Sequence, residues 1–148
     1  MRHVAGGKPV ALTEQYEGSH LAPQWSPDEA VIVFEADERR WIVTPFPGDR
    51  RELEGATGSG GLSWSPDGSR IVYPRDSELL VRPYVGGEER VLVTTHEPHS
   101  PSWSPDGSRI AFVAGNWQHL YSTFVPGNIA PSKLWIVPAD GGEAVAVV

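Results

Sequence analysis

The histidines are the residues of this 148-residue chain whose type and spacing come nearest to a site of chemistry. His96 and His99 stand three residues apart, and two imidazoles in one loop can ligate a divalent metal ion. A metal site needs a third ligand at a fixed spacing, and this pair has none beside it. We therefore predict no metal and no other cofactor. Ligand or metal binding by four histidines remains an alternative: His20, His96, His99 and His119.

Motifs for catalysis are missing from the sequence. The chain has no cysteine, which excludes disulfides, thiolate nucleophiles and cysteine metal sites. The stretch Gly58–Gly61 holds a serine between glycines, but it lacks the Gly-x-Ser-x-Gly spacing of a nucleophile elbow. The segment Gly55–Gly60 lacks the lysine and the helix of a phosphate-binding loop. We predict that the chain is not an enzyme.

The elements that must position these residues come from an internal repeat. Trp-Ser-Pro-Asp occurs three times at a constant spacing of 39 residues, at Trp25–Asp28, Trp64–Asp67 and Trp103–Asp106. A short apolar run that ends at a proline and a glycine turn follows each occurrence. Each repeat therefore predicts four short strands, a size that matches one blade of a β-propeller. The second and third strands are apolar throughout, which indicates burial on both faces.

The repeated tetrapeptide predicts a tight turn. Proline suits its first corner, Asp28, Asp67 and Asp106 can cap it, and Gly68 or Gly107 can adopt positive φ. Glu29 replaces the glycine in the first repeat, so we expect a strained or altered turn costing about 1 kcal/mol. The repeat tryptophans should pack between blades. We interpret the acidic stretch Glu35–Glu38 as a solvated hairpin tip.

Two stretches resemble the WD40-like β-propeller repeat of the TolB family, namely Pro101–Phe112 and Leu134–Gly142. The resemblance covers essentially the whole chain and implies an all-β partial propeller. It would have three four-stranded antiparallel blades plus one strand of a preceding blade. Proteins of this kind serve as periplasmic interaction domains, as sensor-like domains of bacterial kinases or regulators, and as propellers of prolyl-oligopeptidase-like enzymes.

The repeat divides residues 1–148 into parts of a single partial propeller. Residues 1–14 would be the last strand of a preceding blade. Blades would follow at 15–56, 57–97 and 98–148, the last with an inserted loop at 115–133. TolB-type propellers usually have six or more blades, and three blades cannot comfortably close a ring. We therefore expect a fragment of a longer bacterial protein or half of a two-chain ring, with open flanks that permit self-association.

Propeller topology places the loops after the second strands and the connections between blades on one face. Trp103 lies 32 residues before Trp135, whereas Trp25 lies only 16 before Trp41, so the extra residues of the third repeat fall on this face. Such long loops are often functional, although loop aromatics can also simply pack the loop onto its blade. The candidate partner- or ligand-binding residues are His20, His96, His99, Trp117, His119, Tyr121 and Phe124.

Charge and hydropathy narrow the class of partner. The formal net charge of −7 argues against nucleic acid, and apolar runs of at most five residues argue against membrane insertion. The N-terminal residues show no signal peptide; only the family resemblance favours a periplasmic setting. We predict a non-catalytic TolB-like module for protein–protein interaction or sensing. The alternative is an accessory propeller of a prolyl-oligopeptidase-like hydrolase, or of a kinase or regulator, whose catalytic domain lies outside this chain.

Overall fold

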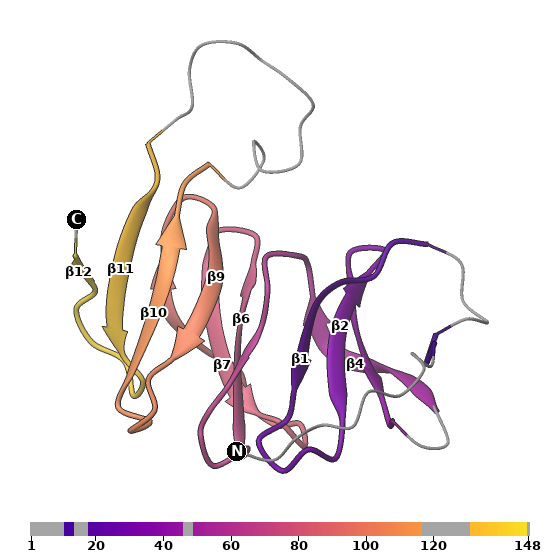
Figure 1. Cartoon of the computed structure of the whole chain (residues 1–148). Helices are drawn as coiled ribbons and strands as arrows, with labels where there is room; N and C mark the ends of the chain where they lie inside the picture. Colours follow the sequence, from indigo (N-terminus) through magenta and orange to yellow (C-terminus); the bar gives the residue numbers. More distant parts are fainter. Residues whose placement is uncertain (1–10, 14–17, 46–48, 117–130, 148) are drawn as a thin grey trace, which may run out of the picture.

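Three four-stranded antiparallel sheets make up the computed structural model, which describes residues 11–13, 18–45, 49–116 and 131–147 (Figure 1). The first sheet contains β1 (Leu21–Trp25), β2 (Ile32–Ala36), β3 (Arg39–Val43) and β4 (Arg50–Thr57). The second contains β5 (Ser63–Trp64), β6 (Arg70–Arg75), β7 (Glu78–Pro83) and β8 (Arg90–Thr94). The third contains β9 (Pro98–Trp103), β10 (Arg109–Ala114), β11 (Lys133–Pro138) and β12 (Val145–Ala146).

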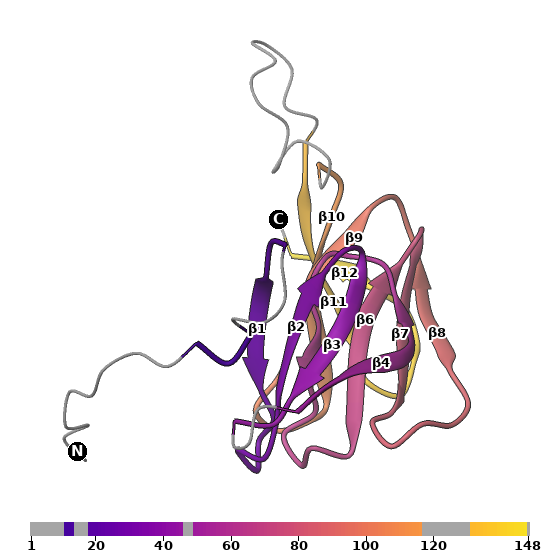
Figure 2. The same cartoon turned by 90° about the vertical axis from the view of Figure 1, so that its right-hand side faces the viewer.

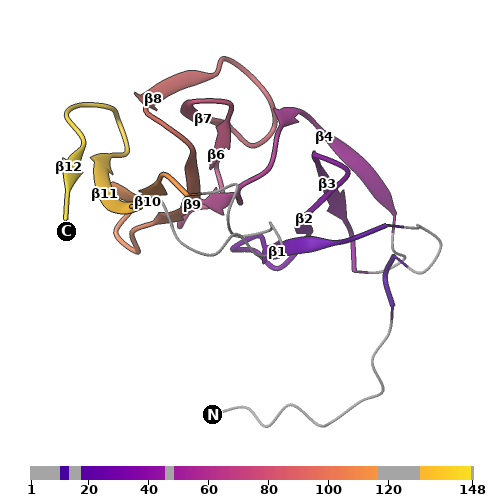
Figure 3. The same ribbon diagram turned by 90° about the horizontal axis from the view of Figure 1, so that it is seen from above.

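Each sheet is a meander in which neighbours in sequence are neighbours in space. Figure 2 looks onto the first sheet, with the other two behind it, and Figure 3 shows the three sheets side by side along an arc. The predicted fold class, an all-β partial propeller with three four-stranded blades, is confirmed. The strand predicted within residues 1–14 lies outside the described residues except at 11–13, of which 12 and 13 form a bend. Among the described residues no helix is long and apolar enough to span a membrane.

The repeated turn has the same hydrogen bonds in all three blades. The hydroxyl of Ser65 donates to Asp67 at 2.5 Å, and its oxygen accepts from the backbone N–H of Arg70 at 2.9 Å. Asp67 also accepts the backbone N–H of Ser69 at 3.0 Å. These hydrogen bonds, led by that of Ser65, lower the pKa of Asp67 to about 2. The aspartates therefore act as turn caps, as predicted.

Glu29 keeps the turn geometry of the glycines that it replaces. Its φ is +60°, against +72° at Gly68 and +75° at Gly107. The expectation of a strained turn is confirmed, because the Cβ of any residue other than glycine is sterically crowded at positive φ.

The core lies between the blades. Trp64 is buried with Val33 and Ile42 between the first and second blades, and Trp103 is buried with Leu79 between the second and third. Trp25 is 54% exposed, so the prediction of interblade packing is wrong for this tryptophan. The physical reason is its position in the first blade, whose outer face has no neighbouring blade among the described residues.

Candidate functional site

One end of the sheets gathers the turns between second and third strands and the connections between blades (Figure 1, top). Five polar residues at this end have positive φ, namely Asp37, Glu38, Asp76, Glu97 and Asn116. Strained backbone of this kind is uncommon outside glycine and concentrates at functional surfaces. This is the face on which the sequence analysis placed the candidate residues.

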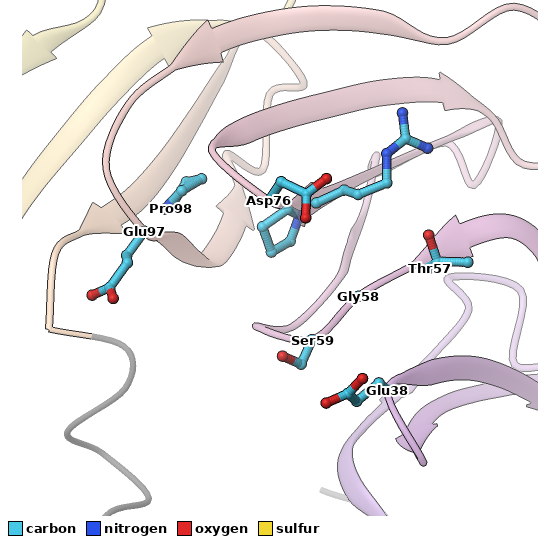
Figure 4. Close-up of a pocket in the computed structure, with 9 residues that line it drawn as sticks. Glu38, Thr57, Gly58, Ser59, Asp76, Glu97 and Pro98 are labelled. Carbon is cyan, nitrogen blue, oxygen red and sulfur yellow. The ribbon is translucent and has the colours of Figure 1, made fainter.

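A pocket of about 470 Å³ opens on this face. Its walls come from the β2–β3 turn, the β4–β5 connection, the end of β6 with the β6–β7 turn, and the start of the third blade. The lining residues are Glu38, Thr57, Gly58, Ser59, Pro74, Arg75, Asp76, Glu97 and Pro98. Figure 4 shows the side chains of Glu38, Asp76 and Glu97 around the pocket, each on a different segment. Its volume suits one or two inserted side chains or a small ligand.

The pocket is acidic. Three carboxylates line it, and its one cationic residue, Arg75, is already paired. The Arg75 guanidinium lies 2.8 Å from the Glu89 carboxylate and also donates to the Gly55 carbonyl at 3.2 Å. The hydrogen bond to Glu89 raises the pKa of Arg75. Glu89 also accepts the hydroxyl of Tyr73, so Arg75 belongs to a network at the interface of the first two blades.

A buried ion pair fixes the pocket wall. Arg40 is fully buried and lies 3.3 Å from Glu35. It donates to the carbonyls of Thr57 at 2.8 Å, Gly61 at 3.0 Å and Pro74 at 3.3 Å. Glu35 in turn accepts the backbone N–H of Gly61 at 2.8 Å. The pair therefore ties the β4–β5 connection and the end of β6 to the first blade.

Glu35 corrects one interpretation of the sequence. The stretch Glu35–Glu38 was expected to be a solvated hairpin tip, but Glu35 is buried and paired with Arg40. The reason is the alternation of the strand, which turns Glu35 toward the interface with the second blade. There it pairs with Arg40 of the neighbouring strand β3 and accepts the backbone N–H groups of Gly60 and Gly61. Burial lowers the pKa of Arg40 to about 10, although the charge of Glu35 opposes this shift.

A second hollow of about 290 Å³ adjoins the first, since Glu38 and Ser59 line both. Its other lining residues are Ser19, Leu21, Glu35, Ala36 and Asp37. The two hollows together extend the concave surface across the first blade.

The predicted histidines take three different environments. His20 stacks at a tilt on Phe34, with 5.1 Å between ring centroids, next to residues of the second hollow. His96 is exposed and lies 3.9 Å from a carboxylate oxygen of Glu97. His99 is buried, and its Nε2 lies 3.1 Å from the Gly115 carbonyl oxygen. Within the described ranges, no group of three His, Cys, Asp or Glu residues could hold a metal ion.

His99 belongs to the base of the inserted loop. The backbone N–H of Gly115 donates to the carbonyls of His96 at 3.0 Å and Glu97 at 3.2 Å, so the insertion leaves the sheet beside the pocket. Four other predicted residues, Trp117, His119, Tyr121 and Phe124, lie outside the described residues.

None of the residues that line the pocket was among the site residues predicted from the sequence. The predicted site residues were histidines and aromatics on this same face, and Ser59, Asp76 and Glu97 were not among them. The available signal was an acidic residue in the turn between second and third strands of two successive repeats, at Asp37–Glu38 and at Asp76.

Comparison with known proteins agrees with this architecture. No protein-family model and no curated protein matches the chain. A solved structure of a candidate TolB from Agrobacterium tumefaciens is 17% identical over 88% of this chain and 46% of its own, with a TM-score of 0.71. The solved nidogen/laminin complex contains a chain that is 12% identical to this one, with a TM-score of 0.69. The match covers 88% of this chain and 48% of that chain.

An enzyme of Vibrio parahaemolyticus, oligogalacturonate lyase, is also similar in structure. It is 17% identical over 90% of this chain and 41% of its own, with a TM-score of 0.64. This chain thus spans less than half the length of each of these three structures. Identities this low establish the fold and leave function to the site. The chain therefore has a TolB-like β-propeller fold.

Proposed function

We propose that this propeller module is a non-catalytic binding module, and that it recognises a protein segment with basic side chains at the acidic pocket. The observation that carries the proposal is that Glu38, Asp76 and Glu97, from three separate segments, line one cavity. Lysine and arginine side chains match the charge of such a cavity, and its volume has room for one or two of them. The formal net charge of −7 favours the same class of partner.

The framework of the pocket supports binding. The Arg40–Glu35 pair and its backbone hydrogen bonds fix two walls before any partner arrives. A preorganised site loses less conformational entropy on binding. The similarity to a chain of the nidogen/laminin complex, a complex of two proteins, is consistent with protein recognition by this fold, although fold alone does not carry function.

The test is direct binding of a fluorescent arginine-rich peptide, measured by polarisation at low and high salt, with polyglutamate of equal length as the negative probe. The variant Glu38→Gln/Asp76→Asn/Glu97→Gln should weaken binding about tenfold, because three rim charges are each worth a fraction of a kcal/mol. The control Glu54→Gln/Glu88→Gln/Glu143→Gln removes the same charge from exposed positions outside the pocket. Equal losses in both variants, or no binding of the peptide, would overturn the proposal.

A second candidate is an enzyme that acts on an acidic carbohydrate, favoured by the similarity in fold to oligogalacturonate lyase. A polyuronate carries one carboxylate per sugar, and the carboxylates of the pocket would repel it. We therefore infer no lyase activity. Incubation with oligogalacturonate, followed by the ultraviolet absorbance of an unsaturated product, should show no change. Product formation that the Asp76→Asn variant abolishes would favour the enzyme.

If the chain is instead an accessory propeller, we propose that the same acidic face binds its partner domain. In that case the basic segment would belong to a hydrolase, kinase or regulator domain rather than to a separate protein. The peptide experiment tests the recognition chemistry common to both.

A further inference from the structure

The two outer faces of the three-blade unit expose apolar side chains. We define the blade 1 flank as Trp25, Ile32, Phe34 and Val43, and the blade 3 flank as Ala111, Leu134, Ile136, Val145 and Val147. In the blade 3 flank Leu134 and Val145 are 42% and 61% exposed. In the blade 1 flank Trp25 is 54% exposed, whereas Phe34 and Val43 are buried in a cluster of the first blade's own residues. Solvent-exposed apolar patches of this kind mark interaction surfaces.

Strand register confirms that each set lies on one side of its sheet. Ile32 pairs with Val43 and with Trp25, so these side chains share a face. In the third blade Ile136 pairs with both Ala111 and Val145. Leu134 lies two residues from Ile136 and therefore points to the same side, because side chains alternate along a strand.

The molecule already contains the contact that would join these two flanks. Between the second and third blades, Val72, Leu79, Val81 and Leu92 pack against Trp103, Ile110, Phe112 and Val137. By the 39-residue repeat and the strand registers, the second-blade residues of this contact occupy the positions of Ala111, Leu134, Ile136 and Val147 in the blade 3 flank. By the same correspondence, the third-blade residues of the contact occupy the positions of Trp25, Ile32, Phe34 and Val43 in the blade 1 flank. The flanks are therefore complementary to each other rather than each to itself.

An arginine–tryptophan contact between the second and third blades also has its counterpart on the two flanks. Arg70 of the second blade lies over the Trp103 ring, 4.9 Å from its centroid. Arg109 holds the same place in the third repeat, after Asp-Gly-Ser, and is exposed. It could lie over Trp25 of another copy in the same way, which is a favourable cation–π contact.

The Ser-Pro-Asp turns also allow the contact. The Pro27 ring lies against Gly68, and a Cβ added at Gly68 would lie 3.7 Å from Pro27 Cδ, an ordinary contact distance. The Cβ of Glu29, which stands in the place of Gly68, would therefore lie at contact distance from Pro105 of another copy in the matching approach. On the outer part of the blade 1 flank, Leu12 and Arg50 pack on Phe34 and Trp41 and would have to be displaced there.

We propose that two copies of this chain associate head to tail, with the blade 3 flank of each on the blade 1 flank of the other. Contacts between unlike surfaces close into a ring when the rotation between copies allows it. The chain covers 46% and 48% of two solved propellers, so two copies supply about the length of one of them. The second copy would also complete the ring of loops around the acidic face.

The experiment is light scattering after size exclusion, with native mass spectrometry across a concentration series. The expected mass is twice 16.1 kDa. Trp25→Glu on one flank and Leu134→Glu on the other should each reduce the mass to that of the monomer. Val85→Glu, at an apolar residue 91% exposed outside both flanks, should leave the dimer intact. A thermal melt of each variant shows that it is folded.

Mixing the two flank variants separates this arrangement from others. A head-to-tail dimer leaves one interface intact in the mixture, namely the blade 3 flank of W25E on the blade 1 flank of L134E. A weak heterodimer should therefore form, while each variant alone stays monomeric. A wild-type monomer at every concentration, masses above the dimer that mark an open chain, or no heterodimer in the mixture would overturn the proposal.

Discussion

Glu29 is the residue at which the repeat conflicts with local backbone preference. Its φ of +60° is a region that glycine adopts freely, so Glu29→Gly should stabilise the folded chain by about 1 kcal/mol. The measurement is the free energy of unfolding in urea. Glu88→Gly, at an exposed glutamate without positive φ, is the matched control and should not stabilise. A loss of stability in E29G equal to that of the control would contradict the prediction.

The turn aspartates make stability depend on acid pH. Hydrogen bonds, first from Ser65, lower the pKa of Asp67 from 3.8 to about 2, so the folded state favours its charged form. This contribution is complete above pH 4 and is lost as the pH falls through about 2. Unfolding free energies measured across this window should therefore decline less steeply in Asp67→Asn. Ser65→Ala, which removes the donor, should flatten the decline in the same way; an unchanged slope in both would contradict the assignment.

At the scale of the elements, the Arg40–Glu35 pair decides how the first two blades meet. Arg40→Met leaves Glu35 buried without its cation, and loss of one partner of a buried pair costs about 3–5 kcal/mol. The variant Arg40→Met/Glu35→Met should cost less than the sum of the single variants. Arg39→Met breaks an exposed pair with Glu52 and should cost less than about 1 kcal/mol. Chemical denaturation of the wild type, Arg40→Met, Glu35→Met and the double variant completes the cycle, and additive losses would argue against coupling.

Across the whole molecule, stability resides in the contacts between blades. Trp64→Ala should destabilise the chain by about 3–5 kcal/mol, because Trp64 is buried between two blades. Trp25→Ala, at the same position of the first repeat, should cost less than about 1 kcal/mol in the monomer, because the side chain is half exposed. Urea unfolding at concentrations where the chain is monomeric measures both. Equal losses would mean that Trp25 has a packing partner of its own.

The sequence by itself determined the elements of this protein. The period of 39 residues and the Ser-Pro-Asp turns predict the strands closely, as at Arg90–Thr94, which is β8. These features depend on local chemistry: proline and glycine restrict the turn, and continuous apolar runs require burial on both faces. Even the strain at Glu29 follows from comparing one repeat with the next.

Only the tertiary structure decided what those elements bring together. Glu38, Asp76 and Glu97 are distant in sequence, and they meet at one pocket because the blades pack side by side. Likewise Glu35 is buried while Trp25 is exposed, which reverses what their residue types suggest. Burial depends on which surface a neighbouring blade covers, and that is a property of the packed molecule rather than of any repeat read alone.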